Sequence, residues 1–172
     1  KLMNRKHTIE EYLLIYDKLK KINSNIEFSS DFIIGYPKEN DDDFKCTMDL
    51  IEKVKFTNSY SFIFSPRPGT VAAELELVDK KKSKERLEII QKKLSENQIN
   101  KNKSLEGKIL NVLVENKMKD GIKLFGRTEY MTSVVFEGNS NCIGKIVKIE
   151  ITSSNQNSLF GIIKENYKKK VA

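Results

Sequence analysis

Two segments in the first third of the chain have the apolar spacing of amphipathic helices. Thr8 followed by Glu11 has the spacing of a capping box, and apolar residues then recur at helical intervals up to Asn23. The second segment begins with Asp41–Asp43, and acidic residues favour the first turn of a helix because its N-terminus is the positive end of the helix dipole. The patterns predict two helices, and the buried stripe of the second one consists of Phe44, Met48, Ile51 and Val54.

Two apolar runs without helical spacing alternate with these helices. Residues 28–36 are rich in Ile and Phe and are closed by Gly35 and Pro37, and residues 58–64 form a similar run. Such runs are typical of buried strands in parallel sheets. The alternation of helix and strand with short connections predicts part of a parallel α/β sheet or α/β barrel. Two repeats are too few to close a barrel, so we expect the others upstream, in a longer protein.

The second half of the chain has a different pattern of residues. Residues 80–103 predict a long basic helix with an apolar stripe, and short β-branched segments separated by glycines follow from Gly107 onward. Short strands of this kind are typical of a small OB-like β-barrel. We therefore expect an α/β part over residues 1–79, a connecting helix over 80–105 and an all-β barrel over 106–172. The expected strands are 109–114, 122–125, 133–136, 143–151 and 159–163.

The net charge of +7 is distributed unevenly along the chain. Residues 1–79 contain 11 Lys/Arg against 14 Asp/Glu, whereas residues 80–105 contain 9 against 3 and residues 106–172 contain 11 against 7. A general Lys richness of the composition does not explain why the first part is acidic. The basic second half predicts contact with a polyanion such as a nucleic acid.

The sequence shows neither a metal-binding motif nor a membrane-spanning segment. Cys46 and Cys142 lie 96 positions apart and outside any CxxC or CxxxCxxC cluster, so we expect free thiols in a reducing cytoplasm and no metal site within this chain. No apolar run approaches the roughly 20 residues needed to span a bilayer, and no signal peptide opens the chain. We therefore expect a cytoplasmic protein without a membrane partner.

Two loops after the expected strands are candidate ligand sites, because parallel α/β barrels bind ligands at the C-terminal ends of their strands. In the first loop, Gly35 lets the backbone approach a ligand closely, and Glu39 is placed to orient the turn by hydrogen bonding. In the second loop, Arg67 lies between two prolines, which restrict the backbone around it. A rigidly held arginine is suited to binding a carboxylate or a phosphate. A plain strand-to-helix turn and an exit loop with a surface-paired arginine are the simpler interpretations.

Residues 123–130 combine aromatic rings, a glycine and an arginine in the β-rich half. This mixture is typical of OB-like barrels that bind single-stranded nucleic acid, because rings stack on bases and arginine pairs with phosphates. Phe125 also fits a core position, since aromatic residues at strand ends usually pack inward. Residues 157–158 add polar groups suited to a ribose or a phosphate. The expected RNA-binding residues are Lys123, Phe125, Arg127, Thr128, Asn157 and Ser158.

Four segments, in this order along the chain, resemble the motifs of one enzyme family. Residues 2–8 resemble the motif LKxMNRxxT, residues 29–39 resemble SSDxIVGFPGE, and residues 60–70 resemble YSFxYSPRPGT. Residues 124–128 are similar to the signature of the TRAM domain that ends these enzymes. The chain thus resembles the C-terminal part of the MiaB-type tRNA methylthiotransferases, which are radical S-adenosylmethionine (SAM) enzymes.

This resemblance implies the fold, the cofactors and a cofactor site. Residues 1–79 correspond to the C-terminal part of a radical SAM partial α/β barrel, followed by the TRAM barrel. The family uses SAM and two 4Fe-4S clusters, whose cysteine ligands are expected upstream, so the chain alone is expected to be inactive. The residues implied in SAM binding are Asp31, Ile33 and Gly35, with Ser65 and Arg67 in the loop that closes that side of the pocket.

The implied function is methylthiolation of N6-isopentenyladenosine at position 37 of tRNA, by a monomer whose TRAM barrel holds the anticodon arm. Lys38 departs from the family motif, which usually has Gly at this place. Two relatives remain as alternatives, one acting on threonylcarbamoyl-adenosine in tRNA and one on an aspartate of a ribosomal protein. A non-catalytic RNA-binding module is the alternative from another class, although half a barrel exposes sheet edges that a finished protein covers.

Overall fold

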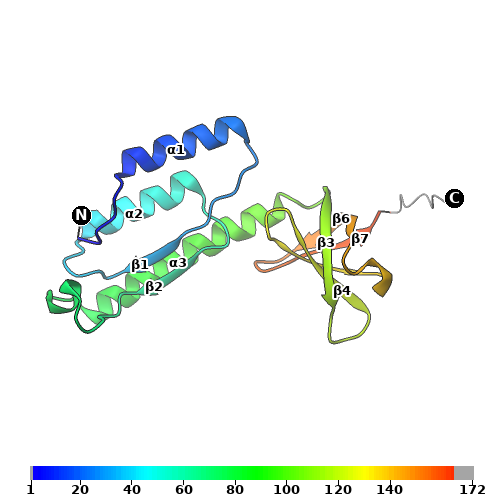
Figure 1. The fold of residues 1–172 in the computed structure, drawn as a ribbon. Helices are drawn as coiled ribbons and strands as arrows, with labels where there is room; N and C mark the ends of the chain where they lie inside the picture. Colours follow the sequence, from blue (N-terminus) through cyan, green and yellow to red (C-terminus); the bar gives the residue numbers. More distant parts are fainter. Residues whose placement is uncertain (1, 165–172) are drawn as a thin grey trace. The chain divides into compact units, whose positions relative to one another are not determined.

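The computed structural model describes residues 2–164, which form two compact units (Figure 1). The first unit extends to Asn97 and combines helices with a two-stranded sheet. The second unit begins at Gln98 and contains a closed β-barrel. Each unit has its own cluster of buried apolar side chains, so the α/β and all-β parts do not share a core.

The two helices expected in the first unit form where the sequence predicts them. Helix α1 spans Ile9–Ile22, and Thr8 and Glu11 close its N-terminus as a capping box, with Oγ1 of Thr8 accepting from N of Glu11 at 3.3 Å. Helix α2 spans Asp41–Val54 behind the capping residue Asn40. Such caps satisfy backbone N–H groups that have no partner within the helix. Both helix starts therefore follow from local sequence.

Strands β1, Asp31–Ile34, and β2, Tyr60–Ile63, form a parallel two-stranded sheet. Asp31 lies opposite Tyr60, and the register continues without a shift to the end of both strands. The parallel pairing confirms the predicted arrangement, although both strands are shorter than the apolar runs that predicted them. A 3₁₀ turn, η1, spans Val71–Glu74 after β2.

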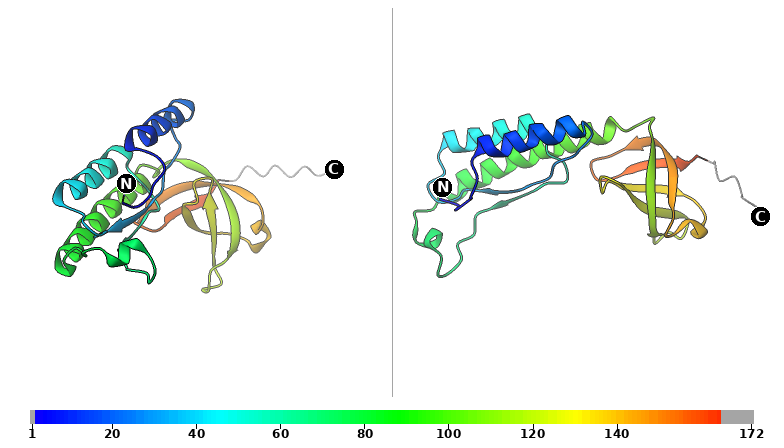
Figure 2. Two further views of the ribbon diagram at one scale, coloured as in Figure 1. Left: turned by 60° about the vertical axis from the view of Figure 1, so that its left-hand side comes forward. Right: turned by 45° about the horizontal axis from the view of Figure 1, so that its top comes forward.

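The two faces of this sheet differ in their environment. Phe32 and Ile34 point from β1 into the core with α2 and the following helix α3 (Lys80–Lys103), which lie on the same side of the strands (Figure 2). The other face carries Ile33 and Phe62, which are 39% and 54% exposed. Two strands with one bare apolar face do not by themselves make a partial barrel. The first core consists of Phe32, Ile34, Ile51, Val54, Phe56, Ile90 and Leu94.

Helix α3 spans Lys80–Lys103, the range that the sequence predicts. Ile90 and Leu94 contribute to the first core, whereas the last turns of the helix belong to the second unit. Ser83 and Arg86 are also buried, which the basic character of this helix did not suggest. Among residues 2–164, no helix is both long and apolar enough to cross a membrane.

The second unit confirms the predicted OB-like barrel. Its strands follow one another in the order β3-β4-β5-β7-β6, and β6 pairs with β3 to close the barrel. Strands β5 and β7 are parallel, and the other neighbours are antiparallel. A 3₁₀ turn, η2, spans Ser140–Cys142. The strands are β3 Ile109–Lys117, β4 Lys123–Thr128, β5 Ser133–Glu137, β6 Ile146–Ser154 and β7 Leu159–Ile163.

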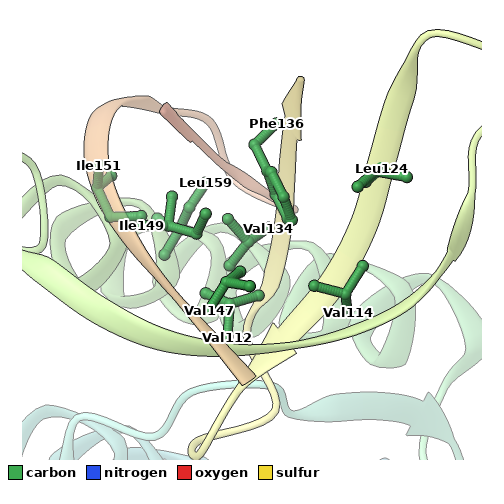
Figure 3. Packing of buried hydrophobic residues seen from close by; sticks show 9 residues of the cluster. All are labelled: Val112, Val114, Leu124, Val134, Phe136, Val147, Ile149, Ile151 and Leu159. Carbon is green, nitrogen blue, oxygen red and sulfur yellow. The ribbon is translucent and has the colours of Figure 1, made fainter. Parts of the chain in front are cut away.

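Alternate residues of the barrel strands fill its interior (Figure 3). Gly126 and Gly161 allow the neighbouring strands to approach, because a Cβ at either position would lie 2.4 Å from a backbone oxygen, that of Leu113 or of Glu150. Such contacts are tighter than real Cβ atoms tolerate. The barrel core consists of Val112, Val114, Leu124, Val134, Phe136, Val147, Ile149, Ile151 and Leu159.

Candidate functional site

A cavity of about 870 Å³ opens at the C-terminal ends of β1 and β2. Ile33, Ser65 and Arg67, three of the predicted cofactor-binding residues, line it together. Arg5 from the N-terminal segment lines it as well, and Phe62 adds an aromatic ring. An apolar wall and two guanidinium groups thus border one space. This combination suits a ligand with an aromatic part and an anionic group.

The other two predicted cofactor-binding residues are placed differently. Asp31 is exposed at the start of β1 and is not among the residues that line the cavity. Gly35 is buried with φ +69°, a conformation that side chains with a Cβ rarely adopt. A Cβ at Gly35 would lie 2.4 Å from Oγ of Ser83 in α3. In this structure, Gly35 therefore serves the close packing of the turn against α3.

The turn after β1 is held by a charge network that reaches α3. Oε2 of Glu39 accepts from the backbone N of Gly35 at 3.0 Å, the orienting contact that the sequence predicts for Glu39. Arg86 donates to Oε1 of Glu39 at 2.6 Å and to Oδ1 of Asp41 at 2.5 Å. Hydrogen bonds from Lys82 and from Arg86 lower the pKa of the exposed Asp41 carboxyl.

The sequence analysis missed Arg86, which is only 3% exposed. A signal was present, because Arg86 lies on the same helical stripe as Ile90 and Leu94. A charged residue on an apolar stripe needs a buried partner. Its partners Glu39 and Asp41 lie 47 and 45 positions away in the sequence, so only the fold identifies them.

On the barrel, the predicted RNA-binding residues of β4 share one outward face. Lys123, Phe125 and Arg127 alternate with the buried Leu124 and Gly126. Phe125 is half-buried and does not belong to the barrel core, so the alternative of a core position is wrong. The structure therefore brings an aromatic ring and two cationic side chains together on the outside of one strand.

Arg127 has a defined position on this face. Its Nη1 donates to Oε2 of Glu115 on β3 at 2.5 Å, and its guanidinium carbon lies 5.1 Å from the centroid of the Phe125 ring. Thr128 is instead buried, and its Oγ1 accepts from the backbone N of Tyr130 and of Thr132. The structure thus gives Thr128 a role in shaping the turn after β4, and we leave it out of the RNA surface proposed below.

The loop between β6 and β7 carries Asn157 and Ser158, the other predicted RNA-binding residues. Their backbone N–H groups donate to Oδ1 of Asn155, so their side chains project from an ordered turn. The fully buried Asn102 of α3 donates to the backbone oxygens of Asn155 and Gln156 at 2.8 and 3.0 Å. Asn102 was not recognised in the sequence, because nothing in α3 indicates a loop partner more than 50 positions away.

The described part of the chain offers no site for a metal ion. Within residues 2–164, no group of three or more His, Cys, Asp or Glu side chains is placed to hold one. Cys46 is exposed and Cys142 is half-buried, and both are free thiols.

Comparisons with known proteins find similar sequences for both units. The family model described as the TRAM domain matches residues 103–164. The tRNA-2-methylthio-N(6)-dimethylallyladenosine synthase of Pelagibacter ubique (strain HTCC1062) is 80% identical over 171 residues, which cover 99% of this chain and 38% of that protein. Proteins with the same name from Ruthia magnifica subsp. Calyptogena magnifica and Buchnera aphidicola subsp. Baizongia pistaciae are 46% and 47% identical.

The matches to these two proteins cover 94% and 93% of this chain and 36% of each relative. The chain therefore spans a little over a third of the length of the curated relatives that it matches. The identity is not confined to the TRAM domain but extends over the first unit as well. Both units therefore take part in the match, and the chain is similar over nearly its whole length to part of a MiaB-type tRNA methylthiotransferase.

Proposed function

We propose that this chain is the C-terminal part of a radical SAM enzyme that methylthiolates N6-isopentenyladenosine at position 37 of tRNA. The observation that carries the proposal is the 80% identity to a protein whose name is tRNA-2-methylthio-N(6)-dimethylallyladenosine synthase. The two relatives of lower identity carry the same name, so no observation favours the threonylcarbamoyl-adenosine or ribosomal-protein alternatives. We further propose that the complete enzyme works as a monomer in the cytoplasm.

In this proposal, residues 1–79 complete an α/β barrel whose other strands lie elsewhere in the protein. The bare face of the β1–β2 sheet supports this, because Ile33, Tyr60 and Phe62 expose apolar surface there. Exposed apolar surface of this kind is normally covered by another part of the protein. Residues 80–105 connect this part to the RNA-binding barrel over 106–172, of which residues 165–172 lie outside the described part of the chain.

We assign the cavity at the ends of β1 and β2 to SAM. Ile33 provides an apolar wall for the adenine ring, and Ser65 and Arg67 provide a hydroxyl group and a cation for its polar and anionic groups. Gly35 acts through the shape of the turn, and Asp31 belongs to the site on the strength of the family motif. When bound, SAM supplies the radical and methyl-transfer chemistry, whereas these residues bind and orient it.

The two 4Fe-4S clusters do not fit the described residues. Residues 2–164 hold no group of three potential metal ligands, and the two cysteines are single free thiols. Clusters of this type are held by sets of cysteine thiolates. The proposal therefore assigns the cluster ligands to the remaining part of the protein.

The barrel would bind the anticodon arm through the outward face of β4 and the β6–β7 loop. Lys123 and Arg127 provide cations for phosphates, Phe125 provides a ring for a base, and Asn157 and Ser158 provide polar groups. Contacts with phosphates set affinity and orientation, whereas contacts with unpaired bases set specificity.

A salt titration of RNA binding tests this half of the proposal. The 172-residue chain should bind a tRNA anticodon stem-loop in fluorescence anisotropy, and the affinity should fall steeply as salt is added. Arg127→Ala should weaken binding about 5- to 10-fold and reduce the slope of log K against log salt by about 1. Lys148→Ala, which removes an exposed cation of β6 instead, is the matched control and should have a smaller effect. Absence of binding at low salt would contradict the proposed role of the barrel.

A further inference from the structure

An apolar row crosses three strands on the outer surface of the barrel. Phe125 of β4 lies directly opposite Val135 of β5, and Val135 lies directly opposite Phe160 of β7. Directly opposite residues of paired strands have Cβ atoms about 5 Å apart and share a face of the sheet. The two phenylalanines are thus separated by two strand spacings, about 10 Å, with a valine between them.

The middle residue of this row is nearly buried although it points outward. Val134 and Phe136 point into the barrel core (Figure 3), so Val135 between them points outward. Nevertheless, Val135 is only 8% exposed, and it does not belong to the core cluster. Phe125 and Phe160 on either side of it are half-buried. The row is therefore a continuous apolar strip whose outer surface consists mainly of the two aromatic rings.

Polar and charged groups surround this strip. Lys123 and Arg127 lie two positions before and after Phe125 on the same face of β4. Each cation has an acidic neighbour, because Lys123 lies opposite Glu137 and Arg127 is paired with Glu115. Phosphate attraction at the strip is therefore partly offset, although residues 98–164 as a whole carry 10 Lys/Arg against 6 Asp/Glu.

We infer that the row Phe125–Val135–Phe160 is a stacking platform for two unpaired nucleobases of an RNA loop. Long-range attraction by the basic unit brings the RNA to the barrel, and the rings then select bases that are free to unstack. A double helix buries its base faces and offers mainly phosphates, to which this partly neutralised strip responds weakly. The guanidinium of Arg127 lies over the Phe125 ring, 5.1 Å from its centroid, and adds a planar cation on which a base can stack. This inference rests on the proposed function and adds Val135 and Phe160 to the RNA site.

The test compares unpaired and paired RNA on the full 172-residue chain. The probes are an anticodon stem-loop and a blunt duplex of the same stem without a loop, both measured by fluorescence anisotropy at one salt concentration. Loss of base–aromatic stacking weakens binding by about 5- to 150-fold per base. We expect Phe160→Leu, which keeps the site apolar, to weaken stem-loop binding on the order of 10-fold and to leave duplex binding unchanged.

A spectroscopic readout and a matched control separate stacking from folding. With 2-aminopurine in the loop, wild-type binding should quench the fluorescence of the base, and Phe160→Leu should remove most of this quenching. Ile109→Ala removes an exposed apolar side chain of β3 from another part of the barrel surface and should change neither signal. Thermal melting followed by circular dichroism checks that both variants are folded.

The outcomes separate this inference from the proposed function. If the wild-type chain binds neither RNA, the proposed function and the platform both fail. If the stem-loop binds but Phe160→Leu has wild-type affinity and quenching, only the platform is refuted. The same conclusion follows if the duplex binds as tightly as the stem-loop.

Discussion

Replacing Arg86 by methionine would remove the centre of the charge network that holds the candidate SAM turn. The substitution keeps a long apolar stem in α3 but deletes the guanidinium, whose donors reach Oε1 of Glu39 at 2.6 Å and Oδ1 of Asp41 at 2.5 Å. The carboxylate of Glu39 would then keep only the N–H of Gly35 as a partner. A nearly buried anion would be left without its counter-charge.

The expected loss of stability follows from the exposure of each partner. The Glu39 side chain is 12% exposed, and breaking a buried ion pair on one side costs about 3–5 kcal/mol. The Asp41 side chain is 78% exposed, so solvent screens this pair and its share of the loss is small. The guanidinium also lies 5.2 Å from the centroid of the Phe44 ring, a contact that contributes about 0.5–1 kcal/mol. Because methionine recovers some packing, we expect a total loss of about 3–4 kcal/mol.

Urea unfolding followed by far-ultraviolet circular dichroism measures this loss, since α1, α2 and most of α3 belong to the first unit. With a slope of about 2 kcal/mol per molar urea, the midpoint of the first unit should fall by about 1.5–2 M. Lys82→Met is the matched control, because Lys82 pairs with Asp41 at the surface, where solvent screens the pair, and its loss should lower the midpoint much less.

A double variant tests whether the unpaired charge is the cause. Adding Glu39→Gln to Arg86→Met removes the buried anion while an amide oxygen still accepts from Gly35, so part of the stability should return. The reasoning is refuted if Arg86→Met destabilises the chain no more than Lys82→Met does. It is also refuted if the double variant is as unstable as the sum of its single changes.

Two further substitutions should improve a property of the chain: one should raise its stability, and the other should raise its affinity for RNA. Lys38 has φ +68°, a conformation that costs a residue with a Cβ about 1–2 kcal/mol. Glycine avoids this strain but loses about 0.5–1 kcal/mol more conformational entropy on folding. Lys38→Gly should therefore stabilise the first unit by about 0.5–1 kcal/mol in the same urea assay. A lower midpoint would show that the Lys38 side chain contributes more than the strain costs. Glu115→Gln frees Arg127 from its acidic partner and should raise stem-loop affinity about 2- to 5-fold, because the Glu115 carboxylate competes with RNA phosphates for the guanidinium. A weaker complex would show instead that Glu115 holds Arg127 in its binding position.

Local patterns in the sequence were sufficient for the element types and for several boundaries. The capping box of Thr8 and Glu11 begins α1, the range 80–103 is that of α3, and alternating short segments predict the barrel strands. These features depend on groups three or four positions apart, or on the two-residue alternation along a strand. The strand ends were less well predicted, because the ends depend on which residues a neighbouring strand pairs with.

The tertiary structure decided the features that depend on partners distant in sequence. It buried Arg86 with Glu39, placed Gly35 against Ser83, turned Phe125 outward and aligned it with Phe160 through the one strand between them. The partners in these arrangements have no local signal, since each arrangement joins residues from separate helices, strands or turns. The helices, the strand segments and the basic charge of the barrel could be predicted from the sequence, because short-range spacing and composition govern them. Which side chains meet at the two candidate sites was determined by packing and strand register, which exist only in the folded chain.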